Sequence, residues 1–260
     1  MADVKMIATR ESYGNTLKAL AAEGHDDLVV LDADLAAATK TGMFRKAHPD
    51  RHFDCGIAEA NMMGVAAGLS TMGYVPFVSS FAMFVAGRAF EQIRNSVAYP
   101  HLNVKIGATH GGISVGEDGA SHQCCEDLAL MRSIPGMVIL SPADDVEARA
   151  AVIAAYNYNG PVYLRFSRLA TPVFHDPATY QFQIGKGEID DTLKQGIADC
   201  IAARELIKVK VLENSEYSAR EAADILCEAL DCECVQVIGR KFVLFKQKKK
   251  ESAYTAVLAK

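Results

Sequence analysis

The stretch Gly56-Ile57-Ala58-Glu59-Ala60-Asn61-Met62-Met63-Gly64 leads into an uncharged segment that runs from Met62 to Gly87. Gly73 and Pro76 interrupt this segment, so it is too broken for a membrane span and indicates a helix, a turn and a buried strand. Continuous apolar strands are typical of parallel sheets that helices cover on both faces. The segment therefore predicts an α/β fold.

The flanking sequence repeats this alternation of short apolar runs and helical stretches, which predicts a doubly wound, mostly parallel sheet. In such folds functional groups gather where strands end and helices begin, because backbone donors and helix dipoles point there. We expect strands near residues 28–31, 74–78, 104–108, 137–140 and 161–166, and helices over 11–23, 58–72, 81–98, 126–133 and 144–156.

Composition is that of a globular protein. The chain has 260 residues, half of them hydrophobic, which is enough for one large core or two smaller ones. Its first twenty residues contain no apolar block, so we expect neither a secretory signal nor a membrane anchor, and a cytoplasmic location. The seven cysteines lack paired Cys-x-x-Cys spacing, and no metal ligands are predicted.

Charge is distributed unevenly along the chain. Residues 1–180 account for the whole formal net charge of −5, whereas residues 181–260 are balanced and end in a basic tail. This change predicts a first domain over 1–180, a small second unit over 181–250 and a tail over 251–260.

Several polar and aromatic residues lie at the predicted strand ends and helix starts. Each has an ordinary explanation: Glu59 complements a helix dipole, Phe81 and Phe84 are core residues three positions apart, and His110 and His122 lie on glycine-rich loops. Their order along the chain is more informative than any one of them.

In that order, Glu59 at a helix start, Ser-Phe-Ala-Met-Phe at 80–84 and Gly-Glu-Asp-Gly-Ala-Ser-His-Gln at 116–123 resemble the pyrimidine-binding domain of transketolase. The resemblance covers about the first 180 residues. It implies thiamine diphosphate as cofactor, held here only by its aminopyrimidine end. A partner chain of the transketolase N-terminal type would hold the diphosphate and Mg²⁺ or Ca²⁺, so this chain would be half an active site.

The resemblance also implies roles for the cofactor-binding residues. Glu59 would hydrogen-bond the pyrimidine ring and assist proton transfer. Phe84 would be the stacking platform and Phe81 its support. Asp34 would lie near the thiazolium ring, although Asp32 competes for this position.

The substrate-binding residues follow from the same resemblance. His110 and His122 would line the substrate channel as catalytic residues, and Asp118 would bind the hydroxyl beside the ketose carbonyl. Arg10 and Arg168 would bind the sugar phosphate through their forked guanidinium groups.

One position departs from the family pattern. Many relatives have a phosphate-binding serine where this chain has Ala38, so phosphate affinity depends on whether Thr39 substitutes for it. The helix that begins at Glu59 carries small residues such as Ala60 and Gly64, and in the family it lies near a subunit interface. Self-association is therefore expected.

The last part of the chain resembles a CRM or YhbY-like RNA-binding domain over about residues 184–250. The matching stretches are Ile184–Gly187, Ala202–Asn214 and Val235–Lys241. Pattern alone predicts helices over 189–203 and 219–230 and strands at 206–211, 235–238 and 242–245. The family's first helix has no counterpart, so the unit is expected to be an incomplete α/β domain.

The expected RNA contact is weak. The turn Gly185-Lys186-Gly187-Glu188 ends in an acid that repels phosphate, and the basic run Lys246–Lys250 is equally well explained as a solvated tail. The two resemblances meet near residue 184. A natural fusion, a recombined gene and an assembly error would each produce such a junction.

The leading hypothesis is ketol transfer between sugar phosphates by the pyrimidine-binding half of a split transketolase. The alternatives are an RNA- or ribosome-binding fusion protein with a non-catalytic first domain, and another thiamine diphosphate enzyme component, such as a deoxyxylulose phosphate synthase-like or dehydrogenase-component domain.

Overall fold

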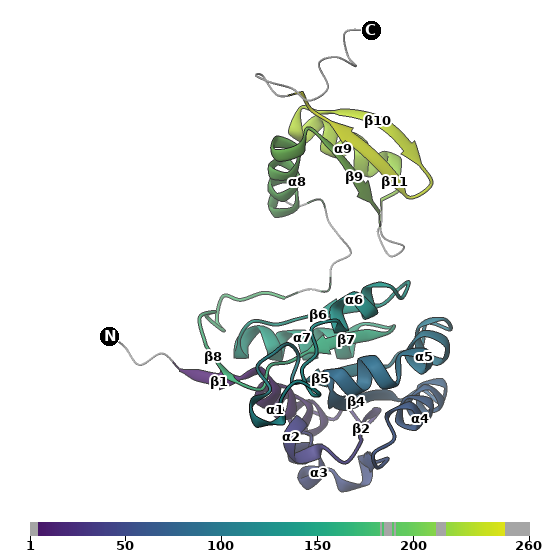
Figure 1. Cartoon of the computed structure of the whole chain (residues 1–260), viewed down its shortest axis with the longest axis vertical. Coiled ribbons are helices and arrows are strands. Elements are labelled where there is room, and N and C mark those ends of the chain that lie inside the picture. Colours follow the sequence, from purple (N-terminus) through teal and green to yellow (C-terminus); the bar gives the residue numbers. More distant parts are fainter. Residues whose placement is uncertain (1–4, 183, 185–188, 190, 212–216, 248–260) are drawn as a thin grey trace. The chain divides into compact units, whose positions relative to one another are not determined.

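The chain forms two compact units, Met1–Ile184 and Gly185–Lys260 (Figure 1). The structure, a computed structural model, describes residues 5–182, 184, 189, 191–211 and 217–247. The predicted turn Gly185–Glu188 and the predicted tail, with Lys248–Lys250, lie outside the described residues.

The first unit is built on a six-stranded parallel sheet with the order β3-β2-β4-β5-β7-β6. The sequence predicted a parallel sheet and five of these strands, without their order. Helices pack on both of its faces, so the doubly wound α/β fold is confirmed. The strands are β2 (Leu28–Asp32), β3 (His52–Asp54), β4 (Val75–Phe81), β5 (Lys105–Thr109), β6 (Val138–Leu140) and β7 (Val162–Arg165). Two further strands, β1 (Met6–Ala8) and β8 (Ala170–Pro172), form a separate antiparallel pair.

The expected helices are present with small changes at their ends. The helix predicted to begin at Glu11 begins at Thr9, and the helix with Glu59 begins at that residue. The main helices are α1 (Thr9–Ala22), α4 (Glu59–Thr71), α6 (Asp127–Arg132) and α7 (Asp145–Asn157).

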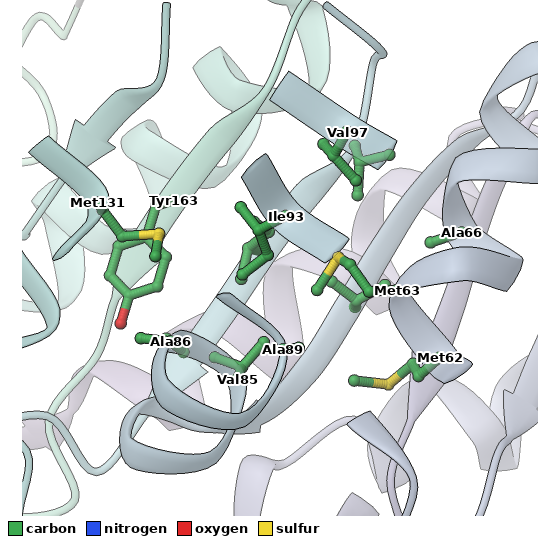
Figure 2. Packing of buried hydrophobic residues seen from close by; sticks show 14 of the residues in the cluster. Met62, Met63, Ala66, Val85, Ala86, Ala89, Ile93, Val97, Met131 and Tyr163 are labelled. Carbon is green, nitrogen blue, oxygen red and sulfur yellow. The ribbon is translucent and has the colours of Figure 1, made fainter. Parts of the chain in front are cut away.

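Two hydrophobic cores lie on opposite faces of the sheet. Because side chains alternate along a strand, Val29 and Leu31 of β2 point to one face and Leu28 and Val30 to the other. The first face packs against α4 and the helical stretch 83–98, and the second packs against α1 and α7. Figure 2 shows the first core, where methionine, valine and alanine side chains of the helices fill the space near Tyr163.

The helix predicted over 81–98 differs from expectation. Phe81 is the last residue of β4, and the helix that follows contains two π-helical segments, Met83–Arg88 and Ile93–Ala98, around the short α5 (Phe90–Gln92). A π-helical turn accommodates an extra residue and is frequent at functional sites. Here it leaves Phe84 and Arg88 in contact with each other.

The short elements between β2 and α4 were not predicted. They are α2 (Ala36–Thr39), α3 (Gly42–Ala47), a 3₁₀ turn at Pro49–Arg51 and β3. The first part of this stretch is held by the buried carboxylate of Asp32, which accepts hydrogen bonds from Leu35 N, Thr39 Oγ1 and Thr41 Oγ1 at 2.5, 3.0 and 2.8 Å. Such a network leaves no periodic signature in the sequence.

A second buried carboxylate anchors the end of the first unit. Asp144 caps α7 by accepting from Glu147 N at 3.0 Å, and it also accepts from Phe174 N and His175 N at 3.0 and 2.9 Å. Burial raises the pKa of Asp144, but these backbone donors outweigh burial and lower it to about 2. The segment after β8 is thereby tied to α7.

The second unit is a three-stranded antiparallel sheet of order β10-β11-β9 with two helices. Its described core includes Leu226, Phe242 and Leu244, and Ser218 and Glu221 form a capping box at the start of α9. The predicted helices and strands are confirmed as α8 (Asp191–Arg204), β9 (Leu206–Lys210), α9 (Ala219–Leu230), β10 (Glu233–Ile238) and β11 (Lys241–Phe245).

The other face of this small sheet carries a basic depression of about 400 Å³. None of the described residues that line it is acidic. They are Lys208, Gln236, Ile238, Gly239, Arg240, Lys241 and Val243. Within the described part of the chain, no helix is long and apolar enough to cross a bilayer.

Candidate active site

The predicted site residues converge on the carboxyl edge of the parallel sheet. The chain passes from β2 to β3 on one side and continues through β4 and β5 on the other, so the order reverses between β2 and β4. Ligands of open α/β sheets bind at such a switch point. Asp34 follows β2, Phe81 ends β4, His110 follows β5 and Arg168 follows β7.

Glu59 is a buried carboxylate at the first position of α4, with 1% of its side chain exposed. Arg88 Nη1 donates to its Oε2 at 2.7 Å, and Ser80 Oγ donates to its Oε1 at 3.4 Å. Neither Arg88 nor Ser80 was predicted from the sequence as a partner of Glu59. The four-residue spacing between Phe84 and Arg88 was the available signal, since it places them on one side of a helix.

Four rings and a guanidinium group form a continuous cluster beside Glu59. The His110 ring stacks on Phe81 with 3.8 Å between centroids, and Phe81 stacks on Phe84 at 5.7 Å. His122 meets Phe84 edge-on at 5.2 Å, and Arg88 lies 4.8 Å from the Phe84 centroid. Phe81 is buried and Phe84 is half-buried.

His110 has left-handed backbone geometry, with φ of 59°, and is only 2% exposed. Its Nε2 lies 3.4 Å from Arg10 Nη1 and its Nδ1 lies 2.9 Å from Thr109 Oγ1. Because a guanidinium can only donate, Nε2 accepts and Nδ1 carries the proton. Burial first, then the charges of Arg10 and Arg168, lower the pKa of His110 to about 4. His110 is therefore neutral at pH 7.

This neutral histidine predicts an acid-sensitive stability. The folded pKa of about 4 lies below the ordinary value of 6.5, so the unfolded chain binds more protons between these pH values. The free energy of unfolding should fall as the pH drops from 6.5 towards 4. Below pH 4 this histidine should cause no further loss. Urea unfolding at several pH values measures the effect.

The variant His110→Asn isolates this contribution, because asparagine does not titrate. The unfolding midpoint of the wild type minus that of the variant should fall as the pH drops from 6.5 towards 4. Asp144, with a pKa of about 2, loses its stabilising effect only in more acidic solution, between 3.8 and 2. Parallel pH profiles of the two proteins would contradict the prediction.

The charges of two arginines, Arg10 and Arg168, act on His110. Arg10 Nη1 donates to Ala38 O at 2.9 Å, while its Nε is buried without a hydrogen-bond partner among the described residues. Arg168 lies 3.5 Å from Glu117, which is 90% exposed, and its guanidinium lies against Gly116, where φ is +78° and a side chain would be strained. Burial and the charge of Arg168 lower the pKa of Arg10. Two neighbouring cations of this kind favour an anion.

The loop that carries His122 and Asp118 borders the same region. Asp118 ends a 3₁₀ turn at Gly116–Asp118 and is exposed, yet its charge partly opposes the lowering of the His110 pKa. His122 is half-buried, and its Nδ1 lies 2.9 Å from Ser121 Oγ. Both residues therefore lie close to the aromatic cluster and to His110.

The network around Asp32 bears on two expectations about the first loop. Asp32 is fully buried and bonded within the loop, so Asp34, whose side chain is exposed, is the acid available to a ligand. The idea that Thr39 substitutes for a phosphate-binding serine at Ala38 is wrong for this structure. Thr39 is fully buried, and its hydroxyl donates to Asp32 and contacts Thr41 at 2.9 Å.

Metal ligands were not predicted for this chain. In the described ranges, no group of three or more histidine, cysteine, aspartate or glutamate side chains is placed to hold a metal ion.

Comparison with known proteins agrees with this geometry. The family model of the transketolase pyrimidine-binding domain matches residues 5–173, and that of the CRS1/YhbY (CRM) domain matches residues 176–246. A protein of Methanocaldococcus jannaschii described as a transketolase C-terminal section is 53% identical over 181 residues, which are 69% of this chain and 57% of that protein.

Two further matches extend the likeness. A 6-deoxy-6-sulfo-D-fructose transketolase subunit of a Clostridium species is 36% identical over 95% of this chain and 74% of its own length. A solved split gene transketolase, described as an inactive beta4 tetramer, is 54% identical with a TM-score of 0.61, over 69% of this chain and 57% of that chain. This chain thus spans 57% of the length of the M. jannaschii protein and of the solved chain. It belongs to the transketolase family, with a pyrimidine-binding domain followed by a CRS1/YhbY (CRM) domain.

Proposed function

We propose that this chain is the pyrimidine-binding half of a split transketolase, which transfers a two-carbon ketol unit between sugar phosphates with thiamine diphosphate. The supporting observation is the buried Glu59, which Arg88 links to the half-buried ring of Phe84 at the switch point of the sheet. A planar ring with a nitrogen to hydrogen-bond and a face to stack suits this pair.

The residues fit the aminopyrimidine end of the cofactor. Glu59 Oε1 has acceptor capacity left, because its Ser80 contact of 3.4 Å is long for a hydroxyl donor. Glu59 and Phe84 would hold the ring, with Phe81 as support and Asp34 at the exposed edge. When bound, thiamine diphosphate supplies the nucleophilic carbon for breaking and forming a bond beside a ketose carbonyl.

The proposed roles divide between the cofactor ring and the substrate. Glu59 would hold and move a proton at the ring nitrogen. His110 is neutral and can exchange hydrogen bonds with sugar hydroxyls, together with His122 and Asp118. Arg10 and Arg168 would bind the phosphate group, in place of the absent serine. The buried Nε of Arg10 has no hydrogen-bond partner among the residues that the structure describes.

A partner chain completes the proposed site. It would be a transketolase N-terminal-type subunit that holds the diphosphate and Mg²⁺ or Ca²⁺. Self-association is also proposed, since Gly64 and Gly68 lie exposed on α4 with open space around them. The related solved protein is described as a beta4 tetramer, which supports this proposal. The cytoplasm is the proposed location.

Reconstitution tests the split site. The purified full chain should show no ketol transfer with thiamine diphosphate, Mg²⁺ and a ketose phosphate, whereas adding an N-terminal-type transketolase subunit should restore turnover. Transfer of the two-carbon unit to an aldose phosphate is measured by mass spectrometry. Turnover by the chain alone would refute the split-site proposal.

A second candidate function belongs to the second unit, which we propose as a separate unit beyond the boundary at residue 180. The basic depression favours an anionic partner, and Lys208 and Lys241 project from the sheet face opposite the core. Weak, non-specific contact with single-stranded RNA follows from these charges.

Salt dependence tests this second candidate. Single-stranded RNA should bind the full chain weakly at 50 mM salt, with affinity falling steeply by 200 mM. The double variant Lys208→Gln/Lys241→Gln should lower the slope of binding against salt. Tight binding that withstands moderate salt would instead raise the RNA-binding alternative above the enzyme.

A further inference from the structure

Arg88 occupies a position with two simultaneous contacts. Its Nη1 donates to Glu59 Oε2 at 2.7 Å, and its guanidinium carbon lies 4.8 Å from the centroid of the Phe84 ring. The Arg88 side chain is 51% exposed, whereas that of Glu59 is 1% exposed. A half-exposed cation therefore contacts a buried acid and an aromatic face together.

The surrounding rings fix where these contacts lie. Phe84 stacks on Phe81, which in turn stacks on His110, with interplanar angles of 13° and 28°. The π-helical turn from Met83 to Arg88 brings the guanidinium back over the Phe84 ring. Arg88 thus extends this stack next to Glu59.

A guanidinium group resembles an aminopyrimidine ring in the properties that suit the position between Glu59 and Phe84. Both are planar, both present N–H donors in their plane, and both stack on aromatic faces. The proposed function requires a ring that hydrogen-bonds Glu59 while lying on Phe84. Arg88 meets both requirements within the chain.

We propose that the Arg88 guanidinium occupies the aminopyrimidine place in the empty protein. Arg88 must leave this place before the cofactor ring can enter. This inference rests on the proposed function. An uncompensated carboxylate at Glu59 would be costly in a buried position, so Arg88 stabilises the empty site and opposes its loading. Its half-exposed side chain can turn to solvent without disturbing the core.

The test measures thiamine binding to the full chain by ligand-observed NMR and titration calorimetry. Thiamine carries the aminopyrimidine ring and lacks the diphosphate, so it probes the part of the site that this chain is proposed to hold. The variant Arg88→Ala should bind thiamine about fivefold more tightly than wild type, because a competing ion pair is removed. Arg88→Lys, which keeps the charge and loses the planar group, should lie between the two.

Arg94→Ala is the matched control. Arg94 lies on the same helical stretch, and its Nη1 donates to Asn95 Oδ1 and not to Glu59. This variant should bind thiamine as the wild type does. Millimolar guanidinium chloride should compete with thiamine in Arg88→Ala, where the place is vacated, and should have little effect on the wild type.

The outcomes separate the inference from the proposed function. Equal or weaker thiamine binding by a folded Arg88→Ala, with wild-type binding intact, would overturn the inference alone. If Arg88→Ala does not fold, the comparison of Arg88→Lys with wild type decides in the same way. Failure of every variant to bind millimolar thiamine, or undiminished binding by Glu59→Gln, would overturn the proposed function and this inference with it.

Discussion

Replacing Glu59 with glutamine should lower the rate of ketol transfer by about a hundredfold or more in the reconstituted complex, as expected for lost acid-base assistance. Glutamine keeps the size of the side chain and can still form hydrogen bonds. It cannot hold or move the proton at the ring nitrogen. The rate is measured by steady-state kinetics with saturating cofactor.

Folding should change little in this variant. Arg88 loses its charged partner, but its half-exposed side chain can be hydrated. The variant Glu91→Gln is a suitable control, because Glu91 is an exposed acid on α5 that bonds to Gln92 and Asn95. The control should keep normal turnover. Unaltered turnover by Glu59→Gln would reduce Glu59 to a charge at a helix start.

Replacing Asp127 with asparagine should destabilise the first unit by about 2–4 kcal/mol. Asp127 is fully buried, and its Oδ2 accepts from Arg165 Nε at 2.8 Å and from Tyr163 Oη at 3.0 Å. Arg165 is only 21% exposed, so removing the carboxylate leaves a mostly buried cation without its partner. Urea unfolding measures the change.

The Asp127–Arg165 pair also supports the loop of the candidate site. Arg165 Nη2 donates to Cys124 O at 3.3 Å, and a Cβ at Gly111 would lie 2.7 Å from Arg165 Nε. The loop from 111 to 124 is therefore packed directly on this guanidinium. Increased protease cleavage within this loop should accompany the loss of stability.

The pair Asp26–Arg51 is the control for the buried carboxylate, because its acid is at the surface and Arg51 also donates to His25 O. Its atoms are 3.4 Å apart and Asp26 is 90% exposed. The variant Asp26→Asn should change the free energy of unfolding by less than about 1 kcal/mol. An equally small effect in Asp127→Asn would show that water, or a shift of Arg165, compensates the lost carboxylate.

Prediction from sequence succeeded where the signal was local. The strands β2, β4, β5 and β7 are runs of apolar residues, and the helices around them have clear starts, so their positions depended on neighbours in the chain. It failed for α2, α3 and β3. The Asp32 carboxylate bonds Thr39 in α2 and Thr41 before α3, and β3 is held by pairing with β2. Periodicity records neither kind of contact.

The candidate site was predicted in part for the same reason. Glu59, Phe81, Phe84 and His110 were identified because they follow one another in an order that resembles a known family, and the structure brings them together. Their roles remain predictions. Arg88 was missed, since its partner Glu59 lies 29 residues away and only the packing of two helices brings them into contact.

The sequence by itself therefore determined the doubly wound sheet, the helix start at Glu59 and the presence of a second unit, because each depends on patterns of neighbouring residues. Only the tertiary structure decided which acid of the first loop is exposed, which residue pairs with Glu59, and that His110 is neutral. These outcomes depend on burial and on contacts between distant segments. Loss of water and the approach of charges set them, and neither is recorded in the local order of residues.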